Sequence, residues 1–292
     1  MYLESIIDNN MIYSVDMIRL KTYITYSKFS ELEFFLKVNY QDKIKKMWLS
    51  DRIMCFKYNY SIELEEGKSF YFGFHCNNEK ISYFKSDVKY NFTIEFNPNK
   101  LKDNSLLLYI LRLDGDWYLK SLDLAIDLKI NILDIITTTT GKRTQKVISN
   151  GFDDKTIYIG SGDKRIKIYN KKKESNLNIQ GDLTRVEVSL QFDNFRLIDI
   201  KLFKLPDDIF PVLYLNNYLY TFADYKDKTL FAMVYAVQNG FPIDDLSRVY
   251  KDKVKKLFNG GQLIKFSRKV ADEVIRRTIF HYFMPNELVK WK

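Results

Sequence analysis

The sequence predicts an α+β protein with a mostly antiparallel sheet, helices on one face of that sheet, and a mainly helical C-terminal region. Segments with period-two alternation recur up to about residue 190, and segments with helical spacing lie between some of them. From about Leu213 onward the spacing is mainly helical, with a break at Gly260-Gly261. The chain has 292 residues, of which 46% are hydrophobic, so it can form one large domain or two modest ones.

The order of these patterns gives the expected elements. A boundary near Leu205-Pro206 would separate an α+β region, residues 1–205, from a helical region, residues 206–292. The strands expected at 55–64 and 69–75 should form a hairpin whose turn contains Glu66-Gly67. Strands are expected at 16–24, 55–64, 69–75, 91–97, 117–128 and 183–190, and helices at 30–47 and 101–113.

Residues 157–171 are predicted to form two further short strands around a glycine-rich turn, Gly160-Ser-Gly-Asp-Lys164. This turn lacks the G-x-x-x-x-G-K-[ST] spacing of a phosphate-binding loop, and no helical pattern follows it. A hairpin turn is therefore the better interpretation. In the second strand, the polar side chains of Arg165, Lys167, Tyr169 and Lys171 alternate with Ile166 and Ile168.

Tyr169 is therefore expected among three cations on the solvent side of its strand. Positive charge favours tyrosinate over phenol, whose pKa is ordinarily about 10, and it would also hold a phosphodiester near the hydroxyl. The pattern indicates a tyrosine that attacks DNA, assisted by Arg165 and Lys171. The competing interpretation is a packing role, because the chain contains 21 tyrosines.

Carboxylates follow the same alternation in the neighbouring predicted strands. Glu95, Asp123, Asp127 and Glu187 all fall on the polar side of their segments, opposite apolar residues. Carboxylate oxygens suit hard cations, which predicts a Mg²⁺ or Mn²⁺ site. Asp123 and Asp127 would be about 13 Å apart in an extended strand, so one ion cannot readily bind both. Asp123 is the favoured ligand, with Glu187 and Glu95. A solvated face without function is the alternative.

Composition narrows the classes of partner and site. The formal net charge of +9 indicates a polyanionic partner, with nucleic acid ahead of an acidic membrane. Two cysteines give no disulfide framework, and the sequence shows neither a signal peptide nor an apolar run long enough to span a bilayer, so a cytoplasmic location is expected. The two histidines, His75 and His281, share no motif. A nickase built from this sequence must therefore hold its metal with carboxylates.

Five blocks of sequence occur in the order seen in one known family. Together they resemble Rep_trans, which comprises the initiators of staphylococcal-type rolling-circle plasmids and related relaxases of some integrative conjugative elements. The resemblance is dense from residue 91 to residue 191. The blocks are E-F-N-P-N-K-L (95–101), L-D-L-A-I-D (122–127), I-G (159–160), I-K-I-Y-N-K-K (166–172) with Glu174, and T-R-V-E-V (184–188).

The resemblance implies a core like that of the HUH nickases but without their histidine motif. It makes Tyr169 the nicking nucleophile, and it assigns the divalent metal to Asp123, Asp127 and Glu187. Two positions depart from the family pattern. Ser121 stands where an arginine is usual, and Ser189 stands where a second glutamate is common. The resemblance also implies a homodimer, recognition of the plasmid origin by the C-terminal region, and recruitment of a host helicase.

The expected activity is initiation of rolling-circle replication by covalent catalysis. Tyr169 would attack one phosphate of single-stranded or extruded origin DNA, leaving a 5′-phosphotyrosine and a free 3′-OH, and the step could later be reversed. Cations beside Tyr169 would neutralise the phosphate and lower the pKa of the tyrosine, while cations of the C-terminal region would contact duplex DNA. The residues expected to bind DNA are Lys167, Arg185, Lys251, Lys253, Lys255, Lys256, Lys265, Arg268 and Lys269.

Three alternatives are open at this point. A conjugation relaxase would perform the same chemistry at a transfer origin. A catalytically silent DNA-binding regulator would keep the fold and bind DNA without forming an adduct. An RNA-binding module would need exposed aromatic residues on the sheet face, where this sequence instead places carboxylates.

Overall fold

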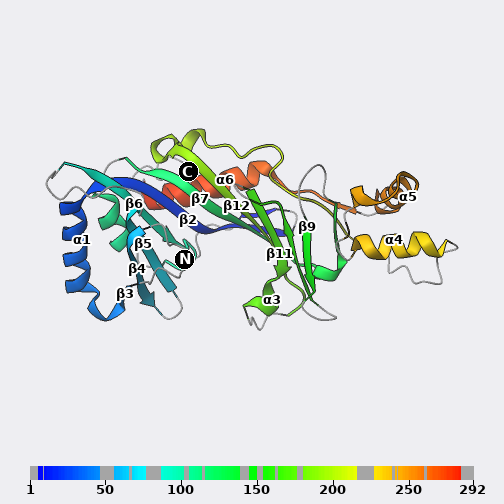
Figure 1. Ribbon diagram of the computed structural model, residues 1–292, viewed down its shortest axis with the longest axis horizontal. Helices are drawn as coiled ribbons and strands as arrows, with labels where there is room; N and C mark the ends of the chain where they lie inside the picture. Colours follow the sequence, from blue (N-terminus) through cyan, green and yellow to red (C-terminus); the bar gives the residue numbers. More distant parts are fainter. Residues whose placement is uncertain are drawn as a thin grey trace.

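The computed structural model carries one dominant sheet and a smaller C-terminal unit (Figure 1). The predicted turn at Glu66-Gly67 and the break at Gly260-Gly261 lie outside the residues that the structure describes. The described residues are 6–8, 10–46, 56–65, 68–76, 87–101, 105–113, 116–138, 145–149, 154–161, 164–175, 180–215, 227–238, 241, 243–259 and 262–283.

The main sheet is antiparallel at every pairing among the described strands. Its strand order is β3-β4-β5-β6-β2-β7-β12-β11-β10-β9, and β1 pairs with β2 at the side. This confirms the predicted α+β class with an antiparallel sheet. The strands are β1 (Ile6–Asp8), β2 (Met11–Thr25), β3 (Ile44–Lys46), β4 (Phe56–Glu65), β5 (Lys68–Cys76), β6 (Lys89–Phe96), β7 (Tyr118–Leu128), β9 (Gln145–Ser149), β10 (Lys155–Ile159), β11 (Lys164–Asn170) and β12 (Thr184–Arg196).

Helices cover the apolar face of this sheet. Alternate residues of the strands, such as Leu124 of β7 and Val188 of β12, are buried on that face in one continuous core. The same core contains side chains of α1 (Tyr26–Asn39), α2 (Ser105–Leu111) and α6 (Arg268–Phe283). In Figure 1, α1 stands at one end of the sheet, and α6 runs beside β2 and β7. The other face of the central strands is left for polar side chains.

A smaller unit is built mainly from residues after β12, together with β8 from earlier in the chain. It contains a second antiparallel sheet, β14-β13-β8, and two helices with their own core around Val234 and Val254. Figure 1 places α4 and α5 together at the end of the molecule opposite α1. Its elements are β8 (Ile135–Thr138), β13 (Val212–Leu215), α4 (Lys228–Gln238), α5 (Arg248–Asn259) and β14 (Gln262–Ile264).

The predicted boundary at Leu205-Pro206 falls in a packed segment. Leu205 and Ile209 are both buried in the main core, so no exposed linker begins there. The region after the boundary contributes to both units, because α6 returns to the main sheet while α4 and α5 form the separate core. The helix predicted at 30–47 is wrong at both ends. It begins at Tyr26, where Thr25 caps the first turn, and it ends at Asn39 because Ile44 pairs with Ile62 of β4.

The hairpin predicted around Gly160 is confirmed. β10 ends at Ile159, β11 begins at Lys164, and Gly160 has a φ of 76° that favours glycine. A Cβ at Gly160 would also lie 2.8 Å from the carbonyl oxygen of Lys164.

In the described part of the chain, helices that combine the length and the apolar character needed to cross a bilayer are absent.

Candidate active site on the polar face

The register of three neighbouring strands brings the predicted site residues together. β12 lies between β7 and β11, so side chains of equal parity on all three strands share one face. Tyr169 is opposite Arg185, which is opposite Asp127. Two residues further along the strands, Lys167 is opposite Glu187. Two residues beyond that pair, Ser189 lies between Arg165 and Asp123. The sequence blocks around these residues therefore converge on one surface.

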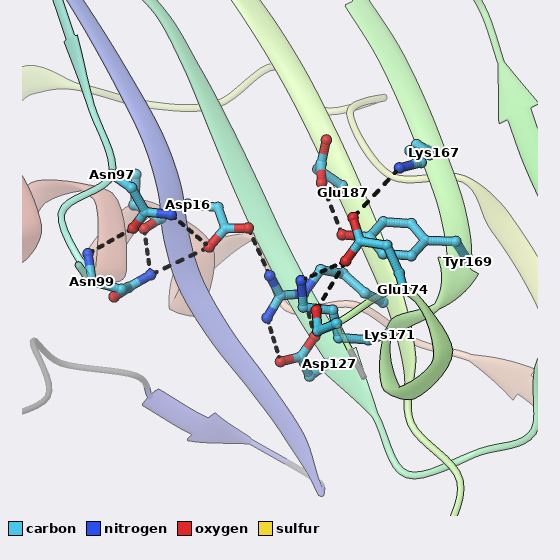
Figure 2. A network of polar contacts seen from close by, with 12 residues as sticks. Asp16, Asn97, Asn99, Asp127, Lys167, Tyr169, Lys171, Glu174 and Glu187 are labelled. Carbon is cyan, nitrogen blue, oxygen red and sulfur yellow. Dashed lines mark hydrogen bonds and ion pairs between the residues drawn. The ribbon is translucent and has the colours of Figure 1, made fainter. Parts of the chain in front are cut away.

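Tyr169 is buried beneath charged neighbours rather than displayed to solvent, with only 4% of its surface exposed. Its hydroxyl donates a hydrogen bond to Glu187 Oε2 at 3.2 Å (Figure 2). The ring lies under two ammonium groups, with Lys167 Nζ 4.0 Å and Lys171 Nζ 5.8 Å from its centroid. Glu174 of the short helix α3 (Lys171–Glu174) pairs with both lysines, at 4.0 Å and 2.8 Å.

The expectation that the cations lower the pKa of Tyr169 is wrong for this arrangement. Burial raises the pKa of the Tyr169 phenol, and the negative charge of Glu187 raises it further, while Arg185 opposes both effects. Lys167 and Lys171 lie over the ring and are paired with Glu174, so their charge is not directed at the hydroxyl. Tyr169 is therefore a phenol in this state, and ionisation requires a change in its surroundings.

Asp123 and Glu187 form a pair of carboxylates without an arginine partner among the described residues. They occupy diagonal positions on β7 and β12. Burial raises the pKa of both groups. The negative charge of Asp123 raises the pKa of Glu187 further, and the negative charges of Glu95 and Asp16 raise the pKa of Asp123. A hydrogen bond with Ser189, one of the positions that depart from the family pattern, partly offsets the rise for Asp123. Two desolvated carboxylates in repulsion are a donor set that fits a divalent cation.

The other two predicted metal ligands are engaged elsewhere. Glu95 accepts hydrogen bonds from Arg19, including one from Nε at 2.7 Å. Asp127 binds Arg185 through both of its oxygens, at 2.6 and 2.7 Å. Within the described residues, no group of three or more histidine, cysteine or acidic side chains is close enough to hold a metal ion. Of the four predicted carboxylates, Asp123 and Glu187 are the two for which no ion pair with an arginine is found among the described residues.

Arg185 is the centre of a buried ionic network that the sequence did not reveal. Besides the two bonds to Asp127, its Nη1 donates to Asp16 Oδ2 at 2.6 Å. Asp16 was not among the predicted site residues, and strict alternation from Ile18 would place it on the core face. A β-bulge between Val15 and Met17 changes the register of β2 and turns Asp16 to the polar face. Two amide side chains, Asn97 and Asn99, approach Asp16 from its other side (Figure 2).

The remaining predicted cations divide into paired and exposed groups. Arg165 lies at the exposed end of the polar face and acts electrostatically on Asp123. In the C-terminal region, Lys251 pairs with Asp244 at 2.6 Å, and Lys253 lies 3.5 Å from Asp227. Arg268 pairs with Asp207 and, at 3.8 Å, with Asp272. Lys253 is nevertheless exposed, as are Lys255, Lys256, Lys265 and Lys269.

The chain was compared with known proteins and with solved structures. The chain is similar to a rolling-circle replication initiator protein from Geobacillus stearothermophilus, with 13% sequence identity and a TM-score of 0.37. That likeness covers 88% of this chain and 99% of the other. No protein-family model matches the chain, and no curated protein matches it.

Proposed function

We propose that this protein initiates rolling-circle replication of a plasmid by nicking one strand of origin DNA through Tyr169. The observation that carries the proposal is the contact of the Tyr169 hydroxyl with the half-buried carboxylate of Glu187, near a second half-buried carboxylate, Asp123. These residues come from three of the sequence blocks that resemble the Rep_trans family. A packing tyrosine would not require charged groups on three strands, because carboxylates that lose hydration without a cation destabilise a fold.

The reaction is a transfer of a phosphoryl group between two oxygens. A bond forms between Tyr169 Oη and the phosphorus, the bond from phosphorus to the 3′ oxygen breaks, and the 5′ end remains attached to Tyr169. Glu187 Oε2 is placed to take the phenolic proton, and one proton is delivered to the departing 3′ oxygen. The products are a 5′-phosphotyrosine and a 3′-OH that primes DNA synthesis. Reversal rejoins the strand without an external energy source.

A divalent cation, Mg²⁺ or Mn²⁺, belongs to this proposal. Asp123 and the second oxygen of Glu187 would hold it, because these are the described carboxylates of the site that Arg185 and Arg19 do not occupy. When bound, it would supply a positive charge beside the scissile phosphate. It would also offset the electrostatic repulsion between the two carboxylates.

The scissile strand must displace part of the present cover of Tyr169. Lys167 and Lys171 are held by Glu174, whose negative charge would repel an incoming phosphate. Transfer of the two lysines from Glu174 to the phosphate would place both cations beside the reacting group. Arg165, at the open end of the face, would contact the strand next to the nick.

The proposal extends to partners and location. Duplex DNA beside the nick would contact exposed lysines of the C-terminal region, among them Lys255 and Lys256 of α5 and Lys269 of α6. Binding there would be largely electrostatic and sensitive to salt. A homodimer, a host helicase and a cytoplasmic location complete the proposal, on the strength of the resemblance and the composition.

A silent DNA-binding regulator is the second candidate function. The observation in its favour is the burial of Tyr169, with a raised pKa and 4% exposure. Such a protein would bind origin DNA equally well with Tyr169 replaced by phenylalanine. A conjugation relaxase differs from the first candidate in the DNA site it cuts, and it uses the same residues.

The test is covalent capture of labelled single-stranded origin DNA, with Mg²⁺ or Mn²⁺, on a denaturing gel. We expect an adduct in the native protein that is lost in Tyr169→Phe and in EDTA, a decrease of at least about 1000-fold for loss of the nucleophile. The matched control is Tyr158→Phe, because Tyr158 lies opposite Lys167 on the adjacent strand β10. Normal DNA binding without an adduct would support the silent regulator, and an adduct that persists in Tyr169→Phe would refute our choice of nucleophile.

A further inference from the structure

Arg185 binds two carboxylates, although one would be enough to neutralise its charge. The two oxygens of Asp127 bind its Nε and Nη2 and already form a complete bidentate pair. Asp16 then binds Nη1, at 2.6 Å, from a strand that lies on the far side of β7. The second carboxylate fixes another edge of the guanidinium, so its contribution is to orientation as much as to neutralisation.

Asp16 is itself held in place by its surroundings. The bulge in β2 projects it onto the polar face. Nδ2 of Asn97 and Nδ2 of Asn99 each lie 3.5 Å from Asp16 Oδ1. Asn99 is anchored in turn, because its Nδ2 donates to the Val15 carbonyl at 2.8 Å and its backbone N–H donates to Asn97 Oδ1 at 2.9 Å. A contact chain therefore runs from the loop after β6, through Asp16, to Arg185.

Arg185 retains hydrogen-bonding capacity toward the nucleophile. A guanidinium has five N–H groups, and within the part of the chain that the structure describes three of them are donated to Asp16 and Asp127. Arg185 lies directly opposite Tyr169 in the antiparallel register, so both side chains occupy one face at neighbouring positions. Its charge favours the ionised form of Tyr169.

We propose that Asp16 is a positioning residue, which orients Arg185 so that its two remaining N–H groups meet the oxygens of the scissile phosphate next to Tyr169. This inference rests on the proposed nicking function. It assigns a role to the first strands of the chain, which lie outside the segment that resembles Rep_trans. The remaining donors, one on Nη1 and one on Nη2, can each reach a different phosphate oxygen from one rigid plane, which a lysine in this place would not provide.

The experiment separates binding of DNA from formation of the adduct. Asp16→Asn keeps an oxygen that can accept from Arg185 but removes the charge, and Asp16→Ala removes both. At saturating oligonucleotide we expect the rate of adduct formation to fall about 10-fold in Asp16→Asn and about 100-fold in Asp16→Ala, because small displacements of catalytic groups have effects of this size. The dissociation constant for the same oligonucleotide, measured in a Tyr169→Phe background, should change less than about 3-fold.

A matched control and a double variant make the result specific. Glu273→Gln removes a carboxylate that pairs with Arg277 at 2.6 Å on α6, away from the site, and it should leave the adduct rate unchanged. If Asp16 acts through Arg185, then Arg185→Lys should lower the rate, and addition of Asp16→Asn to it should lower the rate little further. Urea unfolding of each variant identifies any that fail to fold, and Asp16→Asn is the conservative substitution in that event.

Each outcome decides the proposal. A native rate in both Asp16 variants would overturn it, and so would equal losses in binding and in rate, or effects of Asp16 and Arg185 that simply multiply. A native protein that forms no adduct would instead refute the proposed nicking function, and the positioning role would fall with it. The native lane therefore distinguishes the two failures.

Discussion

The polar face around Tyr169 and the surface of α5 contain the same kinds of ion pair in different surroundings. Arg185 and Asp127 have side chains that are 10% and 14% exposed. The corresponding values for Lys253 of α5 and its partner Asp227 are 50% and 38%. The first pair is bidentate at 2.6 and 2.7 Å, whereas the second has one contact at 3.5 Å. Both regions contain an ion pair between a basic residue and an aspartate, and the two pairs differ in how far their side chains are buried.

This difference shows where the fold carries an energetic cost. Charges at the surface of α5 remain hydrated, so pairing there changes stability little. Charges on the polar face have lost water, and this loss is incompletely offset for Asp123 and Glu187, which have raised pKa values. A region that destabilises the fold in this way is a candidate for function, and a hydrated pair is not.

Removal of one member from each pair should give the largest contrast in stability. Arg185→Gln leaves the half-buried carboxylates of Asp127 and Asp16 without their cation, so we expect the free energy of unfolding to fall by about 3 kcal/mol. Lys253→Gln breaks an exposed pair and should change it by less than about 0.5 kcal/mol. Urea titration of both variants measures the difference. Equal losses would show that burial does not separate the two regions.

Asp123 offers a smaller contrast, with a sign that depends on pH. Because burial raises its pKa, the ionised carboxylate is less favourable in the folded state than in the unfolded state. Its unfavourable contribution develops as pH rises from the unfolded value of about 3.9 through the raised folded value, and it is complete above that value. Asp123→Asn should therefore raise the free energy of unfolding at pH 7, by about 1 kcal/mol, while adduct formation is lost.

Asp244, in the C-terminal unit, is the matched control with the opposite sign. The hydrogen bond from Lys251 lowers the pKa of Asp244, so its ionised form favours the folded state. That stabilisation is present above the unfolded pKa and is lost as pH falls through the folded pKa. Asp244→Asn should therefore not stabilise the protein at pH 7. Unfolding measured at pH 3, 5 and 7 compares the two variants, and stabilisation of both at pH 7 would contradict the contrast.

Most of the fold could be predicted from the sequence because the two faces of the sheet differ so strongly. Alternation in β6, β7, β11 and β12 separates buried aliphatic residues from polar ones, and pairing in the structure follows that separation. The end of α1 could not be predicted in the same way. Apolar residues at 44 and 47 continue the helical spacing, but Ile44 instead pairs with Ile62 in a strand whose position the local sequence does not specify.

The sequence predicted which face of the sheet carries the candidate site residues, but it did not predict the electrostatics of that face. Alternation placed Tyr169, Glu187 and Asp123 on one face, and the register confirms that placement. It could not show that Tyr169 is buried, because the cover comes from side chains whose conformations depend on Glu174. It also did not include Asp16, which a bulge turns to the polar face without a local signal in the sequence. Burial and bulges are tertiary properties, which is why they required the structure.

The smallest expected effect concerns the exposed lysines of α5. Lys256→Gln removes one hydrated charge, so affinity for duplex origin DNA should fall only a few-fold, with the salt dependence of log Kd reduced by about one unit of slope. The adduct rate at saturating DNA should remain native, because the residue is remote from Tyr169. Lys167→Gln should instead lower that rate, since Lys167 lies 4.0 Å from the Tyr169 ring. Fluorescence anisotropy across salt concentrations, with the adduct assay beside it, compares the two variants. A lower adduct rate in Lys256→Gln, with a native rate in Lys167→Gln, would mean that duplex contacts on α5 are coupled to the chemistry at Tyr169. The hydrated surface of α5 and the polar face around Tyr169 would then not act as separate binding and reactive regions.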